Sequence, residues 1–226
     1  MTKLSQAIAL ATAMTAGLVA TTTTQAEVEV AASATVSNMY LWRGTDLGGN
    51  TGTPAISGDI VVSTNGAYAG VWTSSGDASL GQEYDLFVGY GAEMGDLALD
   101  LSYWAYIYPG IEGDDIGDLH EIIASAAFKD ASVSVYYNLD QDEDEGTDYI
   151  YTTLGYGYEK FSATYGMTTF SDTEDSDYSH LDLSFAYNDN VSFTLSQVVS
   201  SDLDEDEAGP DRSPKVVVTY SLPIEL

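Results

Sequence analysis

The chain has 226 residues, with 36 Asp and Glu against 6 Lys and Arg, a net charge of -30, and no cysteine. Six basic side chains cannot neutralise a phosphate backbone, so the composition argues against nucleic-acid binding. Without cysteine, the chain forms neither disulfides nor thiolate metal sites. Because 44% of its residues are hydrophobic and 12% are aromatic, the acidity does not indicate a disordered coil. We therefore expect one folded domain whose acidic side chains are kept apart from its apolar surface.

The first 26 residues have the order of a secretory signal peptide. Lys3 gives a short basic start, residues 7–20 are mainly apolar, and small residues lead up to Ala26. This order is typical of export signals, and the apolar run falls short of the roughly 20 residues that a membrane-spanning helix needs. We expect cleavage after Ala26, which leaves residues 27–226 as the exported domain.

From residue 27 onward the hydrophobic pattern has a period of two, as in strands with one apolar and one polar face. In residues 83–94, for example, Tyr84, Leu86 and Val88 alternate with more polar neighbours. The pattern predicts twelve strands, at residues 28–43, 54–63, 67–74, 82–94, 97–108, 119–128, 131–139, 148–158, 161–170, 178–187, 191–199 and 214–226. Most are close to the 9–11 residues of a tilted strand that crosses a bilayer.

The links between these strands alternate in length along the whole chain. Short links rich in turn-forming residues lie at 64–66, 95–96, 129–130, 159–160 and 188–190. Longer links lie at 44–53, 75–81, 109–118, 140–147, 171–177 and 200–213. In an up-and-down arrangement, all long links fall at one end and all short turns at the other, which is typical of bacterial outer-membrane barrels. The sequence therefore predicts an all-β, transmembrane, up-and-down antiparallel barrel of about 12 strands.

A soluble β-sandwich is the alternative fold, since its strands also alternate. A sandwich would have Greek-key connections and polar outward positions. Here many large Tyr, Trp, Leu and Ile side chains share one face, while Ser, Thr, Gly, Asp and Glu share the other. A polar inside and an apolar outside suit a barrel in lipid, which must also be closed because lipid offers no partner to a strand edge. We expect the chain in the outer membrane of a Gram-negative bacterium, with membrane lipid as its partner and no oligomeric state predicted.

The acidic residues fall at one mouth of this barrel and on its inner face. The six longer links hold 21 of the 36 acidic side chains, which makes that mouth anionic. The predicted pore-lining residues are Arg43, Asp59, Glu83, Asp85, Glu93, Asp100, Trp104, Glu121, Asp182 and Lys215. Carboxylates in a pore favour cations, so we expect a porin-like channel for passive diffusion of small cationic or neutral solutes. A filled barrel, in which the acids pair with Arg43, Lys215 and tyrosine hydroxyls, is the alternative, because twelve strands allow either.

One acidic link is similar to the start of a calcium loop. Asp140, Asp142 and Asp144 alternate before Gly146, as oxygen ligands do around a hard cation. The glycine is one place late, however, and no bidentate Glu follows at the required position. We interpret this link as a solvated loop with, at most, weak calcium binding, and we expect no cofactor. A closed barrel whose acidic loops bind divalent cations or a surface partner is the second functional hypothesis.

Enzymatic chemistry would depend on His120 and His180, the two histidines of the chain. No G-x-S-x-G motif or fixed Ser-His spacing marks a nucleophile, and no HExxH motif marks a metal site. Asp182 could orient His180, but we favour an ordinary hydrogen bond of the lumen or rim as the explanation of this i, i+2 pair. We predict no catalytic residue and no enzyme, with a lipid-modifying hydrolase as the third hypothesis.

Five segments resemble a known family. They are residues 37–44 (Ser-Asn-Met-Tyr-Leu-Trp-Arg-Gly), 54–58 (Pro-Ala-Ile-Ser-Gly), 68–74 (Tyr-Ala-Gly-Val-Trp-Thr-Ser), 83–90 (Glu-Tyr-Asp-Leu, then Gly-Tyr) and 106–110 (Tyr-Ile-Tyr-Pro-Gly). In combination they are similar to the TorF family of proteobacterial exported β-barrel proteins, over residues 33–128. The resemblance implies an outer-membrane barrel with a porin role, no assigned substrate and no catalytic residue.

Overall fold

A computed structural model describes residues 28–49, 53–111, 116, 119–139, 149–171, 176–203 and 209–225. Twelve of its strands form one closed antiparallel barrel. The barrel strands are β1 (Glu29–Ser37), β4 (Ala55–Thr64), β5 (Ala67–Asp77), β6 (Gly81–Met94), β7 (Leu97–Ile107), β8 (Leu119–Phe128), β9 (Ala131–Asn138), β10 (Tyr149–Tyr158), β11 (Phe161–Phe170), β12 (Tyr178–Ala186), β13 (Val191–Ser201) and β14 (Lys215–Glu225).

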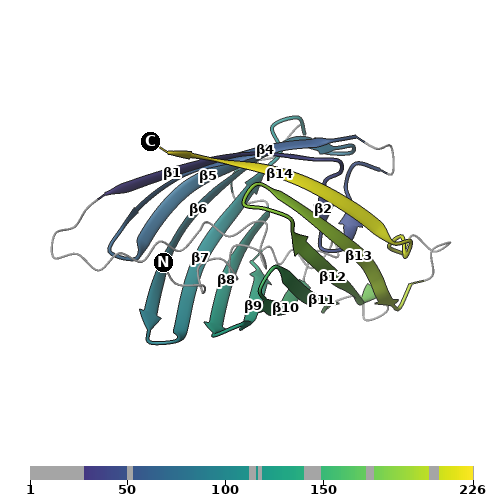
Figure 1. Cartoon of the computed structure of the whole chain (residues 1–226). Helices are drawn as coiled ribbons and strands as arrows, with labels where there is room; N and C mark the ends of the chain where they lie inside the picture. The colour runs from purple at the N-terminus through teal and green to yellow at the C-terminus, as the bar shows by residue number, and fades with distance from the viewer. Residues whose placement is uncertain are drawn as a thin grey trace.

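Each barrel strand pairs with its neighbours in the chain, and β14 pairs with β1 to close the ring. Figure 1 shows this seam, with the yellow β14 alongside the purple β1. Val36 of β1 lies opposite Tyr220 of β14 and opposite Ile56 of β4. The prediction of a twelve-stranded up-and-down barrel is thus confirmed, whereas the predicted signal peptide lies outside the described residues.

The predicted first strand, 28–43, is wrong beyond Ser37. The chain leaves the wall there and forms a small hairpin of β2 (Leu41–Trp42) and β3 (Thr45–Asp46), with Arg43 and Gly44 at its tip. These two residues have φ of 48° and 82°, the pair of positive values that a tight two-residue turn requires. The residues that seemed to extend β1 are therefore part of an inward-folded element, and the expected 44–53 link is partly a strand.

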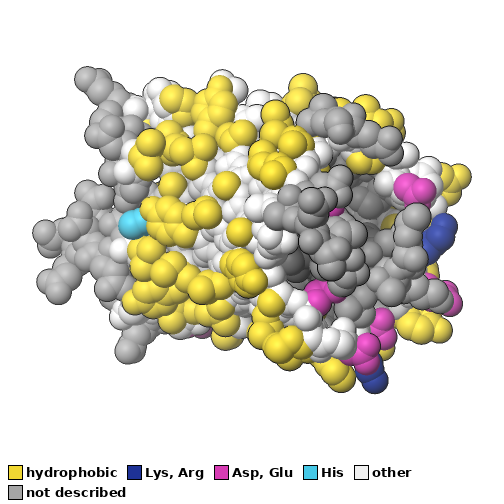
Figure 2. Space-filling model, turned by 90° about the vertical axis from the view of Figure 1, so that its left-hand side faces the viewer, with side chains coloured by type: hydrophobic (Ala, Val, Ile, Leu, Met, Phe, Trp, Pro, Cys, Tyr) yellow, Lys and Arg dark blue, Asp and Glu magenta, His cyan; other side chains and the backbone are white. Residues whose placement is uncertain are grey.

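The two faces of the wall differ as the alternation predicts. Large hydrophobic side chains lie outside, such as Val88 at 54%, Leu101 at 57% and Leu154 at 56% exposure. Figure 2 shows a broad belt of such side chains, in yellow, with the visible charged side chains mainly at its right-hand end. An apolar outer band around a polar interior is the arrangement of a transmembrane barrel. Among the described residues, no helix is long and apolar enough to span a bilayer.

Part of the interior is packed with aromatic side chains. Val61, Phe87, Trp104, Tyr106 and Ile123 form a buried cluster, in which Phe87 and Trp104 stack with ring centroids 4.3 Å apart. The wall makes room for such rings at glycines, because a Cβ added at Gly89 would lie 2.3 Å from the Tyr68 ring. The glycine thus lets the ring of Tyr68 lie flat against the neighbouring strand.

Candidate lumen site

The β2–β3 hairpin, together with the residues around it, forms the centre of the candidate site. It follows β1 directly and therefore lies at the long-link end of the barrel. The amide of Leu47 donates to the carbonyl of Tyr40 (2.8 Å), and the amide of Ala78, in the β5–β6 link, donates to the carbonyl of Leu47 (2.8 Å). These backbone bonds fix the base of the hairpin against the wall, and its tip carries Arg43 into the lumen.

Arg43 and Glu121 form a buried ion pair across the lumen. Nη2 of Arg43 lies 2.6 Å and 2.9 Å from the two carboxylate oxygens of Glu121, and the two side chains are 5% and 0% exposed. Glu121 also accepts hydrogen bonds from the hydroxyls of Tyr106 (2.6 Å) and Tyr149 (2.8 Å). Charge-assisted bonds of this kind offset the cost of burying both charges, so the pair holds the hairpin tip in place.

Aromatic rings surround the same guanidinium. Its Cζ lies 4.3 Å from the ring centroid of Trp42 and 4.4 Å from that of Tyr151. The rings of Tyr149 and Tyr136 follow at 5.1 Å and 5.2 Å. Distances below about 6 Å allow cation–π attraction. We call the wall residues Glu121, Tyr136, Tyr149 and Tyr151 the Arg43 cage.

Two further acidic residues, Glu83 and Asp85, lie on β6, close to the hairpin. Glu83 accepts hydrogen bonds from the hydroxyls of Tyr40 (2.5 Å) and Tyr108 (3.0 Å). Burial and the nearby charge of Glu83 raise the pKa of Tyr40 and of Tyr108, so both phenols stay protonated as donors. Asp85, on the same face two residues on, is 0% exposed and accepts no hydrogen bond from a donor among the described residues.

His180 supports the other side of the hairpin tip. A Cβ added at Gly44 would lie 2.6 Å from the Cβ of His180, and one added at Gly166 would lie 2.2 Å from its Nε2. The imidazole is 1% exposed and lies between Asp182 (Nδ1 to Oδ1, 3.1 Å) and the Tyr151 hydroxyl (Nε2 to Oη, 2.8 Å). Two glycines therefore allow the hairpin, the ring and β11 to approach closely.

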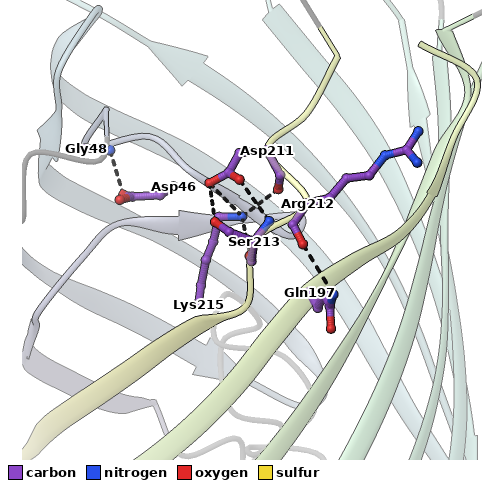
Figure 3. A network of polar contacts seen from close by, with 7 residues as sticks. All are labelled: Asp46, Gly48, Gln197, Asp211, Arg212, Ser213 and Lys215. Atoms are coloured by element: carbon purple, nitrogen blue, oxygen red, sulfur yellow. Dashed lines mark hydrogen bonds and ion pairs between the residues drawn. The ribbon is translucent and has the colours of Figure 1, made fainter. Parts of the chain in front are cut away.

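Lys215 is also buried, but it does not pair with an acid of the lumen wall. Its Nζ donates to the carbonyls of Asp211 (2.7 Å) and Ser213 (3.3 Å), and it lies 3.6 Å from the Asp211 carboxylate. Figure 3 shows these contacts. Hydrogen bonds from Ser213, with the charge of Lys215, lower the pKa of the Asp211 carboxyl. Lys215 therefore stabilises the β13–β14 link.

The remaining predicted pore-lining residues are spread along the inner face. Asp59 accepts a hydrogen bond from the Ser33 hydroxyl, and Asp100 accepts one from Tyr68 (2.8 Å). Trp104 is 4% exposed within the aromatic cluster, whereas Glu93 is exposed near the short-turn end of β6. The structure thus brings together Arg43, Glu83, Asp85 and Glu121 near the hairpin, and leaves Asp59, Glu93 and Lys215 in other surroundings.

The inner wall has two sides of different chemistry. We call the inner face of β5–β10 the aromatic arc, because it carries Tyr68, Trp72, Phe87, Trp104, Tyr106, Tyr136, Tyr149 and Tyr151. We call the inner face of β11–β14 and β1 the hydroxyl arc, because serines and threonines predominate there. Its hydroxyls bond in pairs across strands, as in Thr35 to Ser221 (3.0 Å) and Ser184 with Thr194 (2.8 Å). Thr35, Ser221, Ser184 and Thr194 stay half-buried, so this arc leaves room beside it.

The sequence predicted tyrosine hydroxyls as partners of buried acids in the filled-barrel alternative, but it did not identify which tyrosines complete the site. Tyr106 and Tyr149 position the Glu121 carboxylate, and Tyr40 serves Glu83. A usable signal was the phase of the alternation, since Tyr149 and Tyr151 share the polar face of their strand with Thr153. Tyrosine fits both faces of a membrane barrel, so its presence alone does not predict whether the side chain faces the lumen or the lipid.

Metal and catalytic chemistry find little support among the described residues. In that part of the chain, no group of three or more His, Asp or Glu side chains is placed to hold a metal ion. The candidate calcium residues Asp140, Asp142 and Asp144 lie outside it. His120 contacts the Tyr103 hydroxyl (3.0 Å), whereas His180 lies in the lumen, and no hydrogen bond joins either ring to a serine that the structure describes.

Comparison with known proteins adds a family and two similar folds. Residues 21–208 match the model of a family described as "Bacterial protein of unknown function (Gcw_chp)". No curated protein matches the sequence significantly. A KdgM porin, solved in complex with disordered oligogalacturonate, is 8% identical with a TM-score of 0.45, over 87% of this chain and 99% of that one. The COG4313 outer membrane channel from Pseudomonas putida F1 is 11% identical with a TM-score of 0.45, over 86% and 95%.

Proposed function

We propose that the chain, which belongs to the Gcw_chp family of bacterial proteins of unknown function, is a porin-like channel. It lies in the outer membrane of a Gram-negative bacterium and passes small solutes by diffusion, with a preference for cations. The observation that carries this proposal is the closed barrel itself, which is apolar outside and polar inside. The resemblance to TorF family porins supports the same role.

The hydroxyl arc supports a diffusion path. Most side chains of this arc are small and uncharged. Many of them stay half-buried although they face the interior. The aromatic arc and the β2–β3 hairpin occupy the opposite side, where Glu121, Trp104 and Phe87 are 0%, 4% and 4% exposed. The path in our proposal therefore follows the hydroxyl arc and is narrowest beside the hairpin.

In our proposal, the preference for cations follows from the fixed charges of the inner face, which lie on the hydroxyl arc (Asp182) and on β4 and β7 (Asp59 and Asp100). Asp59, Asp100 and Asp182 are partly exposed on the inner face, whereas the buried Arg43 is neutralised by Glu121 and Lys215 turns to Asp211. A path lined by carboxylates concentrates cations and repels anions.

Reconstitution of the purified chain into planar bilayers tests this function. We expect discrete conductance, with a reversal potential in a salt gradient that favours cations over anions. Neutralising the partly exposed Asp100, by Asp100→Asn, should reduce the preference for cations. The changes Glu83→Gln and Asp85→Asn measure how much the buried acids Glu83 and Asp85 contribute to the same preference. Anion selectivity, or no conductance at any salt concentration, would contradict the proposal.

A second function is favoured by the buried hairpin. If the Arg43–Glu121 pair keeps the lumen closed, the acidic long links become the functional surface, where they bind divalent cations or a surface partner. Calorimetric titration with calcium, combined with absent single-channel conductance, would identify this closed barrel. The third hypothesis, a lipid-modifying hydrolase, would be ruled out if replacing both His120 and His180 caused no loss of lipase or deacylase activity.

We also propose that residues 1–26 are removed during export. The mass of the protein purified from outer membranes would then correspond to residues 27–226.

A further inference from the structure

We infer that the Arg43 cage is a binding site for organic cations, which the hairpin fills with its own guanidinium. The fitting solutes carry a guanidinium or an alkylated ammonium group. As the solute class of a channel, this inference rests on the proposed function. Binding of a cation to the cage, in contrast, can be measured whether or not the protein conducts ions.

The carboxylate of the cage is oriented by the wall and not by the hairpin. Tyr106 donates to Glu121 from β7 (2.6 Å), and Tyr149 donates from β10 (2.8 Å). The backbone of Glu121 itself pairs with Trp104 and Asn138 on the neighbouring strands. Since none of these groups belongs to the hairpin, the carboxylate keeps its position when Arg43 is absent, and a planar cation can take the same two oxygens.

The rings of the cage also belong to the wall. Tyr136 lies on β9 and Tyr149 and Tyr151 lie on β10, and their centroids are 4.4 to 5.2 Å from the guanidinium carbon. Tyr136 and Tyr151 are directly opposite each other in the sheet and 5.2 Å apart between centroids. Aromatic faces around a carboxylate are the usual means of holding a guanidinium or quaternary ammonium group. The carboxylate of Glu121 repels anionic solutes.

The guanidinium of Arg43, which now fills the cage, is held there by a small element, the β2–β3 hairpin. The hairpin has two residue pairs, and Arg43 has φ of 48° at its tip, a left-handed value that costs energy for a residue other than glycine. Nη1 of Arg43 has no hydrogen-bond partner among the described residues. A free cation needs no strained turn and can orient all of its donors, so it competes with the tethered side chain.

Replacing the occupant gives the direct test. Arg43→Ala in the full chain, in detergent micelles, vacates the cage, and Arg212→Ala is the matched control because it removes an arginine of the β13–β14 link. The probes are methylguanidinium and agmatine, each against sodium chloride of equal ionic strength. We expect Arg43→Ala to bind both probes roughly 10- to 100-fold more tightly than Arg212→Ala, the range for one charge-assisted bond set.

The double variant Arg43→Ala/Glu121→Gln distinguishes the cage from non-specific attraction to an acidic protein. We expect it to lose the added affinity, because the carboxylate is gone while the rings remain. Equal binding by Arg43→Ala and Arg212→Ala would overturn the inference. Retention of the added affinity by the double variant would overturn it as well.

A reporter in the otherwise unchanged protein covers the case in which Arg43→Ala does not fold. The chain has no cysteine, so Thr45→Cys places one thiol on the hairpin, and its alkylation rate measures hairpin release. Agmatine should raise that rate several-fold above the sodium chloride control. No acceleration by agmatine would overturn the inference, whereas absent conductance with intact binding would overturn only the proposed channel.

Discussion

The aromatic arc and the hydroxyl arc meet where β10 pairs with β11, but they are built on different principles. The aromatic arc buries acids and rings together, with Glu121 fixed by two tyrosines and one arginine. In the hydroxyl arc, short side chains bond to each other across strands, and many stay half-buried. The difference shows that a barrel can fill one side of its lumen with packed rings while it lines the other side with short side chains.

The largest expected effect comes from breaking the ion pair of the aromatic arc. Glu121→Ala leaves the guanidinium of Arg43 buried without its carboxylate, which should cost about 3–5 kcal/mol of unfolding free energy. Urea unfolding, followed by the gel mobility of the folded barrel, measures it.

Ser196→Ala is the matched change in the hydroxyl arc. Ser196 is also 0% exposed, and its hydroxyl has no hydrogen-bond partner among the described residues. Its removal should therefore be close to neutral. If Glu121→Ala and Ser196→Ala were equally stable, the contrast between the two arcs would be incorrect.

A smaller loss is expected where a ring lies against a glycine. Gly89→Ala places a Cβ 2.3 Å from the Tyr68 ring, which should cost about 1–3 kcal/mol through overpacking. Gly110→Ala is the control, because its Cβ would make an ordinary 3.5 Å contact with the Leu80 carbonyl. In a Tyr68→Ala background, Gly89→Ala should cost less in thermal unfolding than it does in the natural sequence. An equal cost in both backgrounds would mean that the ring is not the cause.

Cutting one bond of the hydroxyl arc should cost less. Thr35→Val removes the hydrogen bond to Ser221 but keeps the shape of the side chain, so we expect a loss of about 0.5–1.5 kcal/mol in urea unfolding. A loss well above about 2 kcal/mol would indicate that this arc is as tightly coupled as the aromatic one.

The smallest effect concerns pH and the β13–β14 link. The pKa of Asp211 is lowered in the folded protein, so its ionised form stabilises the fold at pH above its unfolded pKa of about 3.9. That contribution is lost as the pH falls through the lowered pKa. Solvent screens this half-exposed group, so Asp211→Asn should remove only a slight part of the acid sensitivity between about pH 5 and 3, measured by thermal unfolding. An unchanged acid profile would contradict it.

The wall of the barrel could be predicted from the sequence because its causes are local. Alternation and turn residues act within a few positions, as at Asn65 and Gly66, whose φ values of 50° and 85° close the β4–β5 turn. The predicted strands at 119–128 and 161–170 coincide with β8 and β11. A period of two also predicts which face each acid takes, and Glu83, Asp85 and Glu121, which it assigns to the inner face, are 2%, 0% and 0% exposed.

The hairpin could not be predicted because its cause is distant. Tyr40 and Trp42 continue the alternation of β1, and nothing local ends that strand at Ser37. The side chain that holds the tip, Glu121, is 78 residues away in the chain from Arg43. Only the Arg-Gly pair hints at a turn. Arg43 and tyrosine hydroxyls were expected as partners of the buried acids in the filled-barrel alternative. The individual tyrosines were not identified, because each reaches its acid from another segment of the chain.

The pairing of β1 with β14 has a consequence for the order of folding. The strands elsewhere pair with neighbours in the chain, but the seam joins residues such as Val36 and Tyr220 from opposite ends of the barrel. Contacts so distant in sequence form late, because the chain loses the most freedom in making them. Until then both strands present open edges. The β2–β3 hairpin follows directly on β1. The hairpin that carries Arg43 into the lumen is therefore attached to a strand that completes its pairing last.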